Sequence, residues 1–80
     1  MIAEMEAVKT LDCRQQFCPG PVLRAKEAID LLAPGQVLEI LATDQAAESD
    51  IPSWAKWAGH QLLLVERQDG TLRFLVRKGE

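Results

Sequence analysis

Prolines and glycines divide this chain of 80 residues into short segments, and that division constrains its fold more than any other feature. Proline cannot continue a helix and biases the preceding residue away from helical geometry, whereas glycine ends helices and forms tight turns. Such residues lie at positions 19–21, 34–35, 52, 59, 70 and 79. The chain is therefore expected to be one small domain built from short elements, with no room for a second core.

The hydrophobic pattern assigns an element to each segment. Apolar residues alternate or run together where strands are expected, and they recur at helical spacing where helices are expected. The prediction is a strand over residues 6–13, a helix over 19–33, a strand over 36–43, a helix within 44–60 and a hairpin over 61–78 turning at Asp69 and Gly70. The first two strands should be parallel because a helix connects them. The predicted fold class is α+β, a two-layer α/β sandwich of order β-α-β-α-β-β, with two helices on one face of a four-stranded mixed sheet.

Burial and helix ends follow from the same pattern. Pro52 is expected only in the first turn of the second helix, which Gly59 should end in a left-handed conformation. The candidate caps of that helix are Asp44, Ser49 and Asp50. Its apolar face should contain Ile51, Trp54, Ala55 and Ala58, and the last strand should bury Leu72, Phe74 and Val76 while Arg73, Leu75 and Arg77 alternate with them.

Composition excludes several classes of protein. A formal net charge of −3 argues against direct nucleic-acid binding, which usually needs an excess of Lys and Arg. No stretch is apolar and long enough to insert into a membrane, and the acidic N-terminal residues do not resemble a signal peptide, so a cytoplasmic location is expected. Two cysteines are too few for a disulfide framework. A monomer whose single domain spans residues 1–80, with an ordered core of about 6–78, is the simplest expectation.

Cys18 is the candidate reactive residue, because it immediately precedes the predicted first helix. Unpaired N–H groups and the helix dipole stabilise a thiolate at such a position. Pro19 suits the first helical position, Gly20 leaves the sulfur open and Pro21 stiffens the turn. The pattern alone fits equally well a small buried cysteine beside a proline-rich cap.

The stretch LDCRQQFCPGPVLRAKEAI, with its Cys-Pro-x-Pro motif, resembles the TusA/SirA-like sulfur-carrier (sulfurtransferase) family. Further similarity lies in Pro34 and Gly35, in SDIPSWAKWAGHQL and in the final hairpin, so the resemblance covers residues 11–78. Two features depart from the family pattern. Gln15 stands where the family often has Gly, and the second strand and second helix lack the cysteine that some members carry there.

The resemblance implies a sulfur relay. Cys18 would accept sulfane sulfur as a persulfide from a donor protein, a cysteine desulfurase or a rhodanese-like protein, and would pass it to an acceptor protein by thiol exchange. Relays of this kind serve tRNA thiolation, sulfur oxidation, cofactor synthesis or thiosulfate use. No metal or organic cofactor is implied. Such a domain is a sulfurtransferase-type carrier rather than a stand-alone enzyme.

Other residues have a functional and a structural interpretation. Cys13 is either a resolving thiol for a Cys18 persulfide or a small packing residue, and packing is favoured. Arg14, with Arg24 and Lys26, could stabilise the thiolate or steer an anionic substrate, and Arg14 is the preferred candidate. His60 could serve as a base or ligand, although a structural role is favoured.

Two readings from other classes stay open. The domain could be a non-catalytic regulatory or docking module with a redox-sensing cysteine. Trp57, at the edge of the apolar face of the second helix and partly exposed, is a weak candidate for partner contact. It could also bind RNA, since RNA-binding domains of similar outline exist, but the sequence has no aromatic residues arranged on strands for base stacking.

Overall fold

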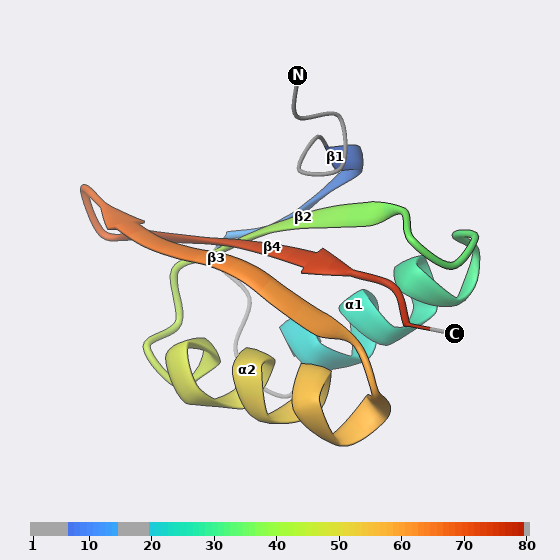
Figure 1. Cartoon of the computed structure of the whole chain (residues 1–80). Coiled ribbons are helices and arrows are strands. Elements are labelled where there is room, and N and C mark those ends of the chain that lie inside the picture. Colours follow the sequence, from blue (N-terminus) through green and yellow to red (C-terminus); the bar gives the residue numbers. More distant parts are fainter. Residues whose placement is uncertain (1–6, 15–19, 80) are drawn as a thin grey trace.

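The computed structural model describes residues 7–14 and 20–79 of the chain. Its elements follow the predicted order β-α-β-α-β-β (Figure 1). They are β1 (Ala7–Cys13), α1 (Gly20–Asp30), β2 (Val37–Ala42), α2 (Ala47–Ala58), β3 (Gln61–Gln68) and β4 (Thr71–Arg77).

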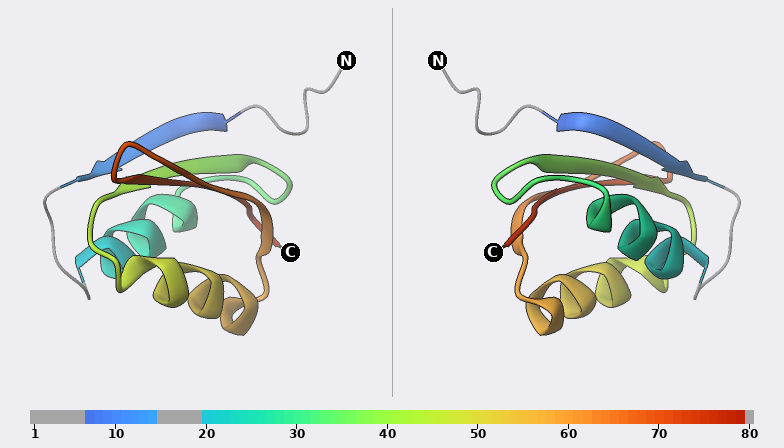
Figure 2. Two further views of the ribbon diagram at one scale, coloured as in Figure 1. Left: turned by 90° about the vertical axis from the view of Figure 1, so that its left-hand side faces the viewer. Right: turned by 90° about the vertical axis from the view of Figure 1, so that its right-hand side faces the viewer.

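The four strands form one mixed sheet in the order β1-β2-β4-β3. β1 and β2 are parallel, as the helix between them requires, and the other two pairings are antiparallel. Both helices cover the same face of the sheet (Figures 1 and 2). The predicted two-layer α+β fold is therefore confirmed.

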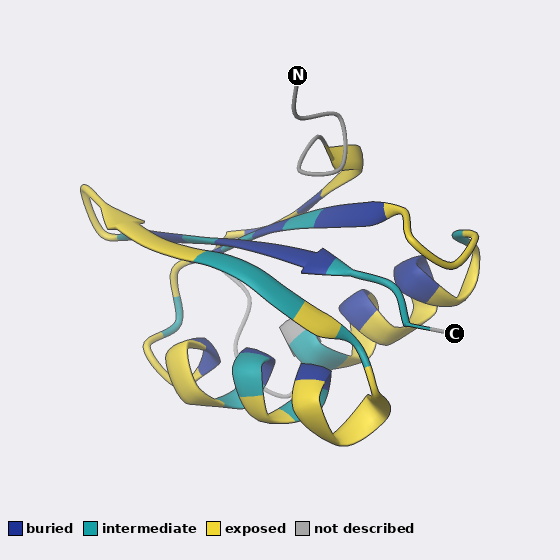
Figure 3. Cartoon of the chain, in the orientation of Figure 1, coloured by how far each residue is buried: buried dark blue, intermediate teal, exposed yellow. Residues whose placement is uncertain are grey.

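The core fills the space between the helices and the covered face of the sheet. Inward-facing side chains of β2 and β4 alternate with outward-facing ones, because successive residues of a strand point to opposite faces. The buried cluster includes Ala25 and Ile29 of α1, Ile51 and Ala55 of α2, Leu38 and Ile40 of β2, and Leu72, Phe74 and Val76 of β4 (Figure 3). The predicted inward face of β4 is thus confirmed.

The first helix is shorter than predicted, because it ends at Asp30 and not at residue 33. After Asp30 the chain forms the tighter hydrogen bonds of a 3₁₀ turn, since the N–H groups of Leu31 and Leu32 bond to carbonyls three residues back. Pro34 keeps Ala33 out of helical geometry, and a turn bond from the N–H of Gln36 to the carbonyl of Ala33, 3.0 Å long, then leads into β2.

Three predictions for the second helix were wrong. Its N-cap is Ala46, whose methyl side chain cannot make a capping bond, and not Asp44, Ser49 or Asp50. The carboxylate of Asp44 accepts the N–H of Ala46 at 3.1 Å in the turn before the helix. The helix begins early and Pro52 lies in its second turn, where the missing proline N–H removes one bond to the carbonyl of Glu48. Ala58 is exposed because it is the last residue of the helix.

The corner after α2 also holds the C-terminal end of β4. Gly59 has a φ of 85° and ends α2 in the left-handed conformation that the sequence predicts. The Nδ1 atom of His60 accepts the N–H of Gly79 at 3.0 Å, and the His60 ring packs against Trp54 with 5.4 Å between ring centroids. Lys78 ties the same segment to the turn before β2, since its Nζ donates to the carbonyl of Leu32 at 2.6 Å. These contacts with Gly79 and Trp54 favour the structural role of His60.

Substituting Gly79 by Ala should destabilise the fold. A Cβ at this position would lie 1.9 Å from the carbonyl oxygen of Gly59, which is backbone and cannot move cheaply. We expect Gly79→Ala to lower the free energy of unfolding by about 1–3 kcal/mol in urea titrations. Gly70→Asn is the control, because no atom lies within 4 Å of its Cβ and Asn tolerates positive φ. Equal stability of Gly79→Ala and wild type would contradict the close packing.

The stability should also depend on the charge of His60. Burial lowers the pKa of His60 from its ordinary 6.5, so the folded protein favours the neutral ring that accepts the Gly79 N–H. The unfolded chain therefore takes up a proton first, and stability is lost as the pH falls below about 6.5. His60→Asn keeps an acceptor but does not titrate. Urea unfolding at about pH 7.5 and about pH 5.5 should show a smaller loss in this variant than in wild type, and equal losses would refute the role of His60.

Candidate functional site

One end of the sheet gathers the segments that flank the predicted site. Parallel pairing places the last residues of β1 and β2, Cys13 and Ala42, opposite each other, and antiparallel pairing places Leu72 beside Ala42. The β3–β4 turn is therefore at this end as well. Figure 2 shows that both helices begin there too. The chain between β1 and α1 thus leaves and re-enters the described structure at one end of the molecule.

The predicted reactive residue Cys18 and its neighbour Pro19 lie outside the described residues. Gly20 is the first residue of α1 and Pro21 is the second, so the helix begins two positions after Cys18, whereas the sequence predicts Pro19 as its first residue. Pro21 occupies the first turn, where a backbone N–H would have no partner within the helix.

Cys13 lies in the core. Its side chain is 0 % exposed, it belongs to the main hydrophobic cluster, and it pairs with Ala42 across the β1–β2 ladder. Burial raises the pKa of the Cys13 thiol above its usual range, while the charge of Arg24 acts in the opposite direction. A neutral thiol enclosed by apolar side chains is a poor nucleophile. This environment favours the packing role of Cys13 over the resolving role.

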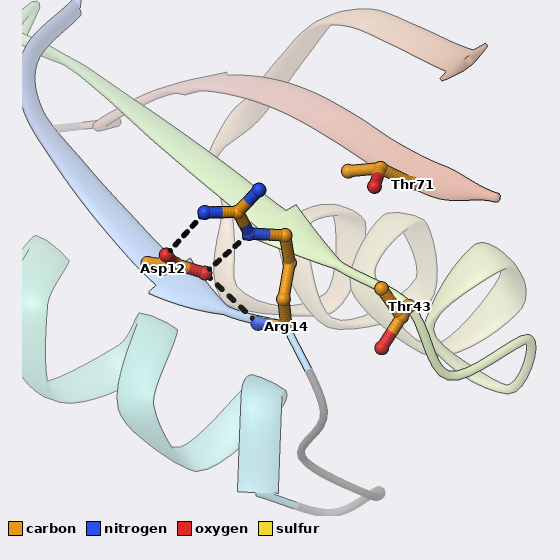
Figure 4. Close-up of a pocket in the computed structure, with 4 residues that line it drawn as sticks. All are labelled: Asp12, Arg14, Thr43 and Thr71. Carbon is orange, nitrogen blue, oxygen red and sulfur yellow. Dashed lines mark hydrogen bonds and ion pairs between the residues drawn. The ribbon is translucent and has the colours of Figure 1, made fainter. Parts of the chain in front are cut away.

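Arg14 is held by Asp12, the residue two positions before it. The Arg14 Nε and Nη2 atoms donate to the two carboxylate oxygens at 2.9 and 2.8 Å, and the Arg14 backbone N–H donates to Oδ1 at 3.1 Å (Figure 4). The Arg14 hydrogen bonds lower the pKa of Asp12 to about 2. The carboxylate therefore stays ionised at neutral pH and offsets the charge of Arg14.

The same pair borders an open depression of about 550 Å³, whose other lining residues are Thr43 and Thr71 (Figure 4). A second depression of about 300 Å³ shares Arg14 and Thr71 and extends over the uncovered sheet face towards Arg73. Both are open surface features, and most of the residues that line them are polar. Such a surface suits contact with another macromolecule better than enclosure of a small substrate.

Polar side chains form a continuous ladder across the uncovered sheet face. Thr10 of β1 donates to Glu39 of β2 at 2.7 Å, Arg73 of β4 bonds to Glu39, and Arg73 Nη1 donates to Glu66 of β3 at 3.0 Å. The Thr10 hydroxyl and then Arg73 lower the pKa of Glu39. This ladder links all four strands, and the sequence pattern did not reveal it because its members are far apart in the chain.

Residues 7–14 and 20–79 contain neither a cluster of metal-ligating side chains nor a helix that could cross a membrane. No three His, Cys, Asp or Glu side chains in that part of the chain are grouped so that they could hold a metal ion. Nor is any of its helices both long and apolar enough to cross a membrane.

Trp57 is 91 % exposed on α2, as the sequence suggested, whereas Trp54 is half-buried against the core.

Substitution of Cys13 should affect stability. Cys13→Ser places a hydroxyl where the thiol is 0 % exposed, so we expect a loss of about 1–3 kcal/mol in the free energy of unfolding. Cys13→Ala adds no polar group and should cost less. Chemical denaturation of both variants tests this order. A Cys13→Ser variant at least as stable as Cys13→Ala would contradict the burial of this residue.

Comparisons with known proteins all indicate the same protein family. The model of the family described as sulfurtransferase TusA matches residues 9–78. The candidate sulfur carrier YrkI of Bacillus subtilis is 40% identical over 75 residues, which cover 94% of this chain and 100% of that protein. A candidate sulfur carrier of Archaeoglobus fulgidus is 46% identical over 71 residues, covering 88% and 92% of the two chains.

Two further comparisons extend this result. The sulfur carrier protein TusA of Allochromatium vinosum is 37% identical over 68 residues, covering 85% of this chain and 90% of that protein. The crystal structure of a SirA-like protein from Desulfitobacterium hafniense has a TM-score of 0.80 and 28% sequence identity, and the match covers 91% of this chain and 100% of that one. Because the family model spans both helices and all four strands, this chain belongs to the TusA sulfurtransferase family.

Proposed function

We propose that this protein is a sulfur carrier that holds sulfane sulfur as a persulfide on Cys18. The observation that carries the proposal is the contrast between its two cysteines. Cys13 is enclosed in the core, which leaves Cys18 as the candidate nucleophile. Relatives matched over almost their whole length are named as sulfur carriers, which supports the same activity.

The proposed chemistry is a pair of thiol exchanges. The Cys18 thiolate attacks the terminal sulfur of a donor persulfide, a new S–S bond forms on Cys18, and the S–S bond of the donor breaks. The donor leaves as a thiolate. An acceptor thiolate then attacks the outer sulfur of the Cys18 persulfide and releases the Cys18 thiolate. The sulfur atom changes carrier without net oxidation, so no cofactor is required.

The start of α1 supports the thiolate form that this chemistry needs. The helix runs for 11 residues from Gly20 to Asp30, and its first turn presents unpaired N–H groups and the positive end of the dipole. Cys18 precedes that turn by two positions. A cysteine beside a helix N-terminus has a lowered pKa, which increases its thiolate fraction at neutral pH.

The partners in this proposal are proteins. A donor, a cysteine desulfurase or a rhodanese-like protein, would load Cys18, and an acceptor protein would take the sulfur onward to tRNA thiolation, sulfur oxidation, cofactor synthesis or thiosulfate use. The open depressions beside Arg14 fit contact with a partner surface. Residues 1–80 would act as one domain, and the exchange needs the reduced thiols that the cytoplasm maintains.

The test is intact-mass spectrometry of the reduced protein after incubation with thiosulfate, or with a cysteine desulfurase and cysteine. Wild type and Cys13→Ala should each gain sulfur that dithiothreitol removes, whereas Cys18→Ser should gain none. Cys13→Ala is preferred to Cys13→Ser because it adds no polar group to the core. Sulfur uptake by Cys18→Ser, or no uptake by any variant with either donor, would refute the proposal. In the second case the docking module becomes the better account.

A further inference from the structure

Three cationic side chains lie near Cys18 in the sequence, and the structure distinguishes them. Arg14 forms the two-pronged pair with Asp12, with Nη2–Oδ2 at 2.8 Å. Lys26 pairs with Asp30 along α1, with Nζ–Oδ2 at 3.2 Å. A carboxylate therefore offsets the charge of each of these two residues.

Arg24 differs from both. Within the part of the chain that the structure describes, its guanidinium takes part in no salt bridge or hydrogen bond, and its side chain is exposed. Its charge nevertheless acts on the Cys13 thiol at the end of β1 and favours the ionised form of that thiol. Arg24 thus contributes a positive charge to the end of the sheet where β1 stops.

Chain geometry brings this charge close to the proposed sulfur site. Two residues of chain span at most ~7 Å, so the Cα of Cys18 lies within that distance of the Cα of Gly20 in any conformation. Arg24 follows Gly20 by one helical turn, ~6 Å along the axis. Side chains on a helix lean towards its N-terminus, a tendency that favours extension of the Arg24 side chain towards the start of α1.

We propose that Arg24 supplies the positive charge that draws anionic sulfur compounds to this end of the protein and stabilises the charged sulfur on Cys18. The inference deepens the proposed function and depends on it for the identity of the reacting sulfur. Thiosulfate carries two negative charges, and attack on it by the Cys18 thiolate brings like charges together. The new S–S bond forms on Cys18 as the S–S bond of thiosulfate breaks, and the leaving group is sulfite. A nearby cation reduces the repulsion during this approach.

The first readout is independent of sulfur transfer. Iodoacetate and iodoacetamide alkylate the same thiolate but differ in charge, so the ratio of their rates reports the local potential. In the Cys13→Ala background, Arg24→Gln should lower the iodoacetate-to-iodoacetamide ratio at Cys18 by about threefold or more at low ionic strength, and salt should reduce the difference.

Two matched variants separate Arg24 from a general effect of charge. Lys26→Gln removes the same charge from the same helix, and Lys56→Gln removes it from the last turn of α2, at the other end of the molecule. Both should change the ratio less than Arg24→Gln. Asp12→Asn frees the charge of Arg14, so adding it to Arg24→Gln should restore part of the loss. An unchanged ratio in Arg24→Gln, or an equal fall in all three single variants, would overturn the inference.

Loading by thiosulfate gives the second readout. The second-order rate of sulfur uptake should fall about tenfold in Arg24→Gln at low salt and recover in Asp12→Asn/Arg24→Gln. If wild type takes up sulfur neither from thiosulfate nor from a cysteine desulfurase with cysteine, the proposed function fails, although the alkylation ratio can still show the charge of Arg24. Uptake from the desulfurase alone leaves the function standing and refutes the role of Arg24 towards thiosulfate. If Arg24→Gln takes up sulfur as fast as wild type, the function stands and the role of Arg24 is refuted.

Discussion

The parallel pairing of β1 with β2 is the constraint on which the rest of the molecule depends. β1 is an edge strand with little buried surface, and only Leu11 and Cys13 of its residues are buried. These two side chains lie opposite Ile40 and Ala42 of β2 and pack into the core beneath the helices. A connection between parallel strands must cross from one end of the sheet to the other, which α1 does. Consequently the end of β1 and the start of α1 meet at one end of the sheet.

The two cysteines are five positions apart and are expected to have opposite roles. Cys13 anchors the end of β1 by burial, which holds its thiol neutral and out of contact with solvent. Cys18 precedes a helix start, where a thiolate is stabilised. In a domain this small most apolar side chains are committed to the core, so a reactive group is more readily placed on the surface than in a pocket. One buried cysteine for packing and one cysteine for reaction suit a carrier that binds successive partners.

Surface charges on the uncovered face are largely paired. Thr10, Glu39, Arg73 and Glu66 are linked across the four strands, and Asp12 pairs with Arg14. Each exposed pair contributes little stability by itself, because solvent screens its charges. Their larger effect is on the local potential, because a paired arginine attracts an anion less strongly than an unpaired one. Of the three cationic residues Arg14, Arg24 and Lys26, only Arg24 is then left without a carboxylate partner among the described residues.

Local signals predicted the elements and much of the core. Asp69 and Gly70 both have positive φ, 53° and 81°, as a tight hairpin turn requires, and periodicity identified the buried face of β4. The sequence missed one local and one tertiary feature. α2 begins at Ala47, after a turn in which the Asp44 carboxylate accepts the N–H of Ala46, so Pro52 lies in its second turn. His60 meets Gly79 from 19 positions away. The Asp12–Arg14 pair had a local signal, an Asp two residues before its partner, but the pattern gave no reason to prefer that partner over solvent.

The most direct test of this account is the pH dependence of alkylation at each cysteine of the folded wild-type protein. An uncharged reagent is used, and modification is quantified on peptides that contain Cys13 or Cys18. The account predicts that Cys18 reacts with a midpoint clearly below about 8.5, the pKa of an ordinary cysteine, and that Cys13 stays unmodified until the protein unfolds. A Cys18 midpoint at or above that value, or equal reactivity of the two cysteines, would contradict it.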